Sequence, residues 1–110
     1  AIRPEDVALV GARSLDPPEL AYMAATGIDD DIDRALAGCD RAYVAFDCDV
    51  LHPGELDVFM PEPGGPTLVE AESLLRRVVE RCPLVGFGLT GLRHGADPSS
   101  LVRLAAAAGL

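Results

Sequence analysis

The sequence of 110 residues contains no lysine, asparagine, glutamine or tryptophan, and all nine of its basic residues are arginines. The absence of lysine excludes mechanisms that need a Schiff-base lysine or a lysine that holds phosphate. The absence of asparagine and glutamine excludes a side-chain amide from any site that this chain builds. We attribute the heavy use of arginine and alanine to genomic bias rather than to function.

Long apolar runs and cysteine motifs are missing as well. No stretch approaches the roughly 20 consecutive apolar residues of a membrane-spanning helix, so we expect no membrane segment. The three cysteines, Cys39, Cys48 and Cys82, are an odd number and lack the C-x-x-C spacing of zinc and redox sites. We therefore expect free, mostly buried thiols in a reducing cytoplasm rather than a disulfide.

The charge balance is strongly acidic. Eighteen Asp and Glu residues stand against nine Arg, which gives a formal net charge of −9. Such a surface repels phosphate backbones and anionic membranes, so we expect neither a nucleic-acid partner nor a membrane partner. Because 49% of the residues are hydrophobic and 25% are charged, the composition is that of an ordinary folded domain.

Short apolar runs alternate with helical patterns along the chain. The apolar runs predict three buried strands, and cap residues with apolar periodicity predict four helices. This alternation predicts an α/β fold with a parallel sheet and right-handed crossovers. The predicted strands are residues 7–11, 42–46 and 84–89, and the predicted helices are about residues 17–26, 31–37, 68–81 and 98–108.

A long segment rich in proline and glycine, residues 48–66, follows the second predicted strand. Asp47 and Asp49 stand where it begins, and residues two apart face the same side of an extended backbone. Two adjacent carboxylates repel each other unless a cation neutralises both, and such oxygen ligands suit Mg²⁺, Ca²⁺ and Mn²⁺. Ligands also bind at the carboxyl ends of strands in open α/β sheets. We weigh a metal site against a pair of caps on a solvated turn.

The residues around this pair form two motifs in a fixed order. Phe46-Asp47-Cys48-Asp49-Val50-Leu51-His52-Pro53 precedes Pro61-Glu62-Pro63-Gly64-Gly65-Pro66-Thr67 and then Glu70-Ala71. They resemble the signature of the ureohydrolase superfamily (arginases, agmatinases and formimidoylglutamases), which reads S-F-D-x-D-x-x-D-P, then P-x-x-G-G-L-T and E-A. The upstream Val10-Gly11-Ala12-Arg13-Ser14, with Asp16 and Glu19, resembles the preceding strand of that family. The resemblance runs from about Val7 to the C-terminus and implies a three-layer α/β/α fold.

The resemblance also implies an activity, a cofactor and site residues. The activity is manganese-dependent hydrolysis of C–N bonds in a small cationic guanidine or amidine. Asp47 would bridge two Mn²⁺ ions, and Asp49 would bind one of them. We interpret residues 61–66 first as a rigid turn and second as a loop whose Glu62, Gly64 and Gly65 contact the substrate. The other ligands of the family lie on earlier strands. We therefore expect residues 1–110 to be the C-terminal part of one α/β domain without an internal boundary, inactive alone and cytoplasmic and homo-oligomeric when complete.

Three positions depart from the family pattern. His52 replaces the third Asp of the first motif, and we favour a turn role over a role as a metal ligand or as a donor behind the ligands. Gly88 and Gly91 stand where the family has the Asp and the substrate-binding Glu of G-x-D-x-x-E-x-N-P. These glycines either open room for another substrate group, contacted by Arg93 or His94, or mark a subunit that has lost its chemistry.

Two alternatives stay open beside the hydrolase. The first is a catalytically degenerate arginase-fold protein with a structural or regulatory role. The second is a haloacid-dehalogenase-type phosphatase, which also carries Asp-x-Asp after a strand and would use Asp47 as nucleophile, Asp49 as acid and Mg²⁺. That family needs a downstream lysine, which this chain lacks.

Overall fold

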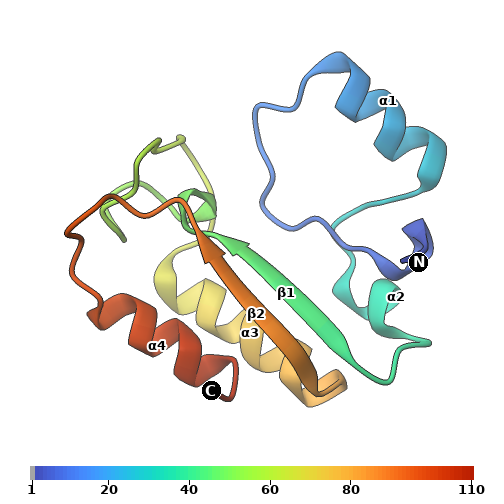
Figure 1. Ribbon diagram of the computed structural model, residues 1–110. Coiled ribbons are helices and arrows are strands. Elements are labelled where there is room, and N and C mark those ends of the chain that lie inside the picture. Colours follow the sequence, from blue (N-terminus) through green and yellow to red (C-terminus); the bar gives the residue numbers. More distant parts are fainter. Residues whose placement is uncertain (1) are drawn as a thin grey trace.

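The computed structural model describes residues 2–110 (Figure 1). Strands β1 and β2 pair in parallel and form a two-stranded sheet. In the register of this pair, Tyr43 lies opposite Gly86 and Asp47 lies opposite Thr90. The elements in chain order are α1 (Pro17–Thr26), α2 (Ile32–Leu36), β1 (Ala42–Asp47), α3 (Leu68–Arg81), β2 (Leu84–Thr90) and α4 (Ser99–Ala107), with 3-10 turns at Pro4–Asp6 and Cys48–Val50.

Capping residues define the starts of the two longest helices. The Asp16 carboxylate accepts from the Glu19 backbone N–H, and the Glu19 carboxylate accepts from that of Asp16. Thr67 and Glu70 form the same reciprocal box at the start of α3. Each box satisfies two N–H groups that the first helical turn leaves without an intrahelical partner. The predicted bounds of α1 and α3 are confirmed.

The hydrophobic core lies between the sheet and the helices α3 and α4. Val44, Phe46 and Phe87 of the strands pack against a buried cluster that includes Leu75 of α3 and Leu104 of α4. An ion pair also joins the two helices, because the buried Glu72 carboxylate of α3 contacts Arg103 of α4. Within α3, Glu72 contacts Arg76 as well. Packing on one side of the sheet therefore holds both strands in place (Figure 1).

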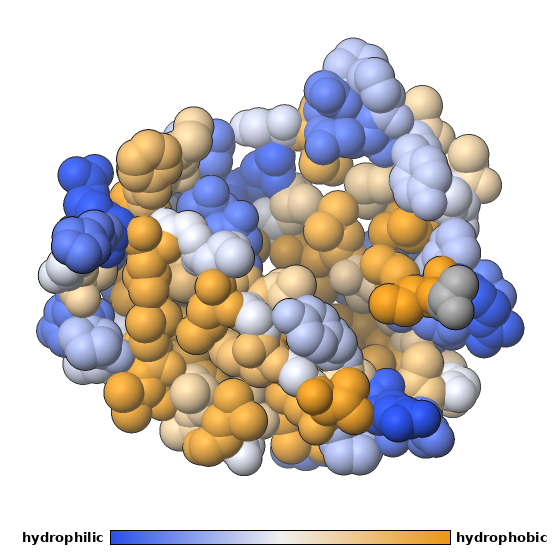
Figure 2. All heavy atoms as spheres, in the orientation of Figure 1, coloured by the Kyte–Doolittle hydropathy of each residue, from blue (hydrophilic) through white to orange (hydrophobic). Residues whose placement is uncertain are grey.

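The opposite face of the sheet is exposed. Tyr43 on this face is 63% exposed, and its ring lies over Gly86 and Gly88 of the neighbouring strand. Figure 2 shows apolar side chains gathered over the strands and α4 on the side turned to the viewer. Parallel sheets are normally covered on both faces, so this exposure is unusual for the fold class.

The predicted strand at residues 7–11 is wrong. Ala8 makes a single bridge with Asp29, and the Leu9 N–H donates to the Asp29 carbonyl at 2.8 Å. The partner segment cannot extend further, because Asp31 immediately caps α2 by accepting from the Arg34 N–H. A strand needs an extended neighbour, and the chain turns into a helix before one can form.

The remaining elements depart little from expectation. Helix α2 is confirmed within the predicted residues 31–37, and β1 and β2 each run one residue beyond the predicted end. Helix α4 begins at Ser99 rather than at Pro98, and the Asp97 carboxylate accepts from the Ser99 N–H. No helix in residues 2–110 is both long enough and apolar enough to span a membrane.

All three cysteines are free thiols, as predicted. Cys48 and Cys82 are buried, whereas Cys39 is partly exposed. Burial, followed by the negative charges of Asp47 and Asp49, raises the pKa of Cys48 to about 11. The Cys48 thiol is therefore protonated at neutral pH and behaves as a small apolar side chain.

Replacing Leu104 with alanine should lower the free energy of unfolding by about 2–5 kcal/mol, because it leaves a cavity in the core. Leu104 is 0% exposed, whereas Val102 on the same helix is 66% exposed. The control Val102→Ala should therefore cost less than about 1 kcal/mol. Urea unfolding followed by circular dichroism measures both values, and equal losses would contradict the described core.

Candidate functional site

The two carboxylates of the Asp-x-Asp motif lie at the carboxyl end of β1. Asp47 is the last residue of the strand, and Asp49 lies in the 3-10 turn Cys48–Val50. The Asp47 carboxylate caps this turn by accepting from the Asp49 backbone N–H at 3.4 Å. The expectation of extended backbone through Asp49 is therefore wrong, because a tight turn rather than strand alternation brings the two residues together.

The environment of Asp49 disfavours the charged form of its carboxyl group. Burial raises the pKa of the Asp49 carboxyl, and the charge of Asp47 raises it further. Glu62 adds a smaller effect in the same direction, while Arg13 acts in the opposite direction. The Asp49 carboxyl is thus affected mainly by its burial and by Asp47. A cation held by Asp47 and Asp49 would relieve the repulsion between these two carboxylates.

The proline-glycine loop (residues 61–66) lies against the same turn. A Cβ atom at Gly65 would overlap the carbonyl oxygen of Val50, and the φ angles of Gly64 and Gly65 are 88° and 87°. Only glycine adopts this conformation without strain and allows so close an approach. The Glu62 carboxylate accepts from the Ser14 hydroxyl at 3.1 Å. The structure therefore gathers Glu62, Gly64 and Gly65 beside the turn that carries Asp49.

Arg13 has a structural role at this site that the sequence does not predict. Its Nη1 atom donates to the carbonyls of Gly11 and Val50, both at 2.8 Å. Its Nη2 atom donates to the carbonyls of Asp49 and Glu62, both at 3.1 Å. The Gly-x-Arg spacing was the only signal in the sequence, and it does not reveal which carbonyls the guanidinium meets.

Side chains of β1 lie next to Gly88 and Gly91. A Cβ at Gly88 would lie 2.6 Å from the Tyr43 hydroxyl oxygen, and a Cβ at Gly91 would overlap Oδ1 of Asp47. The side chains of Tyr43 and Asp47 therefore lie directly beside these two glycines. Arg93 does not extend into the site as a free cation, since it pairs with Asp57 at 3.1 Å.

His52 occupies the turn that follows Leu51. Its ring Nδ1 lies 3.0 Å from the carbonyl oxygen of Pro53, and its backbone N–H donates to the Pro66 carbonyl at 2.8 Å. The latter bond joins the two ends of the long loop. His94, the other histidine, is exposed.

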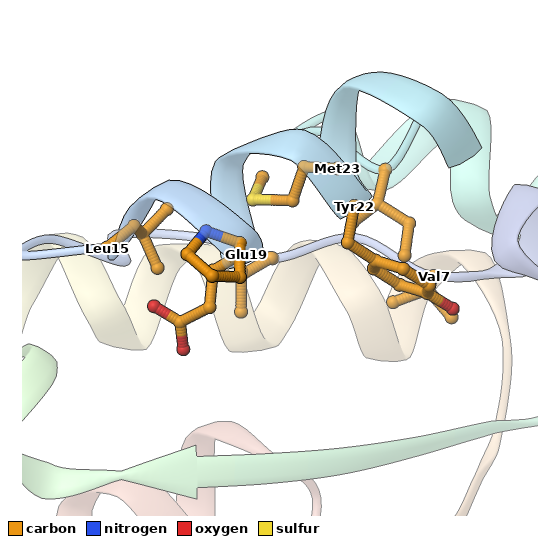
Figure 3. A pocket seen from close by; sticks show the side chains of 8 residues that line it. Val7, Leu15, Glu19, Tyr22 and Met23 are labelled. Carbon is orange, nitrogen blue, oxygen red and sulfur yellow. The ribbon is translucent and has the colours of Figure 1, made fainter.

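The described part of the chain supplies only part of a metal site. In residues 2–110, no three His, Cys, Asp or Glu side chains converge closely enough to hold a metal ion. An apolar groove between α1 and the segment before it, lined by Leu15, Tyr22 and Met23 among others, does not include the Asp pair (Figure 3). The two carboxylates can therefore contribute ligands to a cation but cannot enclose one.

Comparisons with known proteins all point to one family. The sequence model described as Arginase family matches residues 1–109. Among solved structures, an arginase from Bacillus subtilis superposes with a TM-score of 0.77 at 21% identity, covering 94% of this chain and 45% of that one. An arginase from Entamoeba histolytica gives a TM-score of 0.80 at 18% identity, covering 96% and 43%.

A further solved structure carries a different printed activity. Proclavaminate amidino hydrolase from Streptomyces clavuligerus superposes with a TM-score of 0.70 at 23% identity, covering 96% of this chain and 40% of that one. No curated protein matches the sequence. The chain spans less than half the length of the solved structures that it matches. These likenesses confirm the predicted α/β fold class of the arginases.

Replacing Gly91 with alanine should displace the Asp47 carboxylate. Gly91 and Gly95 have similar φ angles, 84° and 82°, so alanine strains the backbone by about 1 kcal/mol at either position. Only at Gly91 would the new Cβ overlap Asp47, and nothing lies within 4 Å at Gly95. The carbon-13 NMR signal of the Asp47 carboxyl should therefore shift in Gly91→Ala and stay unchanged in Gly95→Ala. An unshifted Asp47 signal in Gly91→Ala would contradict this geometry.

Proposed function

Because the chain belongs to the arginase family, we propose that it is the C-terminal part of a manganese-dependent hydrolase acting on a linear guanidine or amidine. The observation that carries the proposal is the pair Asp47 and Asp49, held together at the carboxyl end of a parallel strand. Residues 1–110 then belong to one α/β domain without an internal boundary. The exposed sheet face supports the proposal that the chain is part of a larger domain, because further polypeptide would cover that face.

The residues present fit a hard divalent cation. Carboxylate oxygens are ligands that Mn²⁺ accepts. Burial and the neighbouring Asp47 charge both raise the pKa of the Asp49 carboxyl, and a bound cation would favour its charged form. In the proposed site Asp47 and Asp49 would both be ligands of the Mn²⁺ ions. The described residues offer no third ligand at this place, so the other ligands would come from the rest of the protein.

In the proposed mechanism the metal would activate water, and the side chains would bind the metal and the substrate. Two Mn²⁺ ions would supply a water nucleophile of lowered pKa at neutral pH. Asp47 and Asp49 would hold the ions, and the proline-glycine loop lies beside the turn that carries Asp49. Glu62 presents a carboxylate there that would attract the cationic group of the substrate. The net charge of −9 favours the approach of a cation from solution.

The compartment, the oligomeric state and the partner of the complete protein are part of the same proposal. We propose a cytoplasmic homo-oligomer whose partner is a small cationic substrate rather than nucleic acid or a membrane. The three free thiols support a reducing compartment. The acidic surface argues against anionic partners.

A catalytically degenerate arginase-fold protein is the second candidate. The observation in its favour is that Tyr43 and Asp47 fill the space around Gly88 and Gly91. Because both residues are glycines, the carboxyl end of β2 has no acidic side chain at these two positions to receive a cationic substrate. The haloacid-dehalogenase-type phosphatase is not proposed, because the family match over residues 1–109 is to arginases.

Asp47→Asn and Asp49→Asn should each lower Mn²⁺ affinity and hydrolysis of linear guanidines and amidines by at least about 100-fold, since each removes a charged ligand. The variants are made in the full-length protein and tested by calorimetric Mn²⁺ titration and by ammonia or urea release. Asp40→Asn is the matched control, because the Asp40 side chain is 92% exposed. It should leave both quantities unchanged.

The same measurements separate the two candidates. Wild-type protein that takes up no Mn²⁺ would overturn the hydrolase and favour the degenerate subunit. Metal uptake that persists in both aspartate variants would show that the ligands lie elsewhere.

A further inference from the structure

We propose that Arg13 is the positioning residue of this site, whose guanidinium fixes the turn carrying Asp49 against the proline-glycine loop and thereby sets the affinity for the divalent cation. The metal part of this inference rests on the proposed function. The positioning itself rests on contacts within the described residues.

Arg13 joins segments that are distant in the sequence. Its hydrogen bonds to Asp49, Val50 and Glu62 span 36, 37 and 49 residues. A fourth bond to the Gly11 carbonyl holds the arginine to its own segment. Irregular loops leave carbonyls without regular partners, and hydrogen bonds from a charged donor are among the stronger ones. One side chain therefore fixes three pieces of backbone relative to one another.

The fit around the guanidinium is close. A Cβ at Gly65 would come 2.5 Å from Nη1 of Arg13, and a Cβ at Gly64 would come 3.4 Å from its Cδ. Both glycines therefore leave space that the arginine uses. The Nε atom is buried without a hydrogen-bond partner in residues 2–110. The arginine is thus held by its two terminal nitrogens, at the cost of one unsatisfied donor.

The partners of Arg13 are backbone carbonyls rather than side-chain carboxylates. No acidic side chain of the described residues lies within ion-pair distance of it, as the recorded ion pairs all involve other arginines. Arg13 therefore holds the backbone of Asp49 without occupying the oxygens of Asp47 or Asp49. Those oxygens stay available to a cation. A lysine offers one ammonium group and cannot reach four carbonyls in a planar fork.

Arg34 provides a matched control for this role. Its two terminal nitrogens donate to the carbonyls of Glu5 and Val7, each at 2.7 Å. It also pairs with Asp29 at 2.9 Å. Arg34 therefore connects loops in a similar way, but its partners include neither Asp47 nor Asp49.

Arg13→Lys and Arg34→Lys are compared in the full-length protein by calorimetric Mn²⁺ titration and by amide hydrogen exchange of residues 48–66. Arg13→Lys should weaken Mn²⁺ binding about 10–100-fold, the usual loss when a residue supporting metal ligands is replaced. It should also accelerate exchange in residues 48–66. Arg34→Lys should change neither quantity. Unchanged affinity and exchange in Arg13→Lys, or equal losses in both variants, would overturn the proposal.

The two readouts separate this inference from the proposed function. If the wild-type protein binds no Mn²⁺, the proposed function and the metal part of this inference fail. The exchange comparison then still decides whether Arg13 positions the loops.

Gly65→Ala tests the same role with the arginine intact, should Arg13→Lys fail to fold. Its Cβ would crowd Nη1 of Arg13 and the Val50 carbonyl. The control Gly54→Ala has a similar positive φ, 95°, and no atom within 4 Å of the new Cβ. Gly65→Ala should weaken Mn²⁺ binding at least about tenfold more than Gly54→Ala. A folded Gly65→Ala protein with the affinity of Gly54→Ala would contradict the proposal.

Discussion

The parallel pairing of β1 with β2 is the interaction on which the candidate site depends. Because both strands run in the same direction, their carboxyl ends meet, and Asp47 lies opposite Thr90 and beside Gly91. The buried cluster of α3 and α4 holds this pair from one side. The loops that leave the two strands therefore start from neighbouring points, and their residues meet although they are distant in the sequence.

Close backbone approach is the second constraint. Gly65 and Gly91 have φ angles of 87° and 84°, and a side chain at either position would overlap a neighbouring oxygen. Other segments of the chain pack directly against both glycines. At Gly91 the neighbour is the Asp47 carboxylate itself, so the orientation of a candidate metal ligand depends on the absence of a side chain at the residue that follows β2.

Arginine side chains donate the long-range hydrogen bonds that connect the loops. The chain has no lysine, asparagine or glutamine, so arginine is its only long side chain with several donors. Arg13 and Arg34 both bind backbone carbonyls of distant segments. The exclusive use of arginine among the basic residues thus has a structural consequence, because the planar guanidinium can satisfy several carbonyls at once.

The sequence by itself determined the helices and the family, because capping boxes, apolar periodicity and the Asp-x-Asp motif depend on residues close together in the chain. It also located the loop against which Asp49 packs. Only the tertiary structure decided that residues 7–11 form no strand, that Tyr43 and Asp47 fill the space at Gly88 and Gly91, and that Arg13 joins the loops. Strand pairing, free space and long-range hydrogen bonds depend on which distant segments meet, and folding alone brings those segments together.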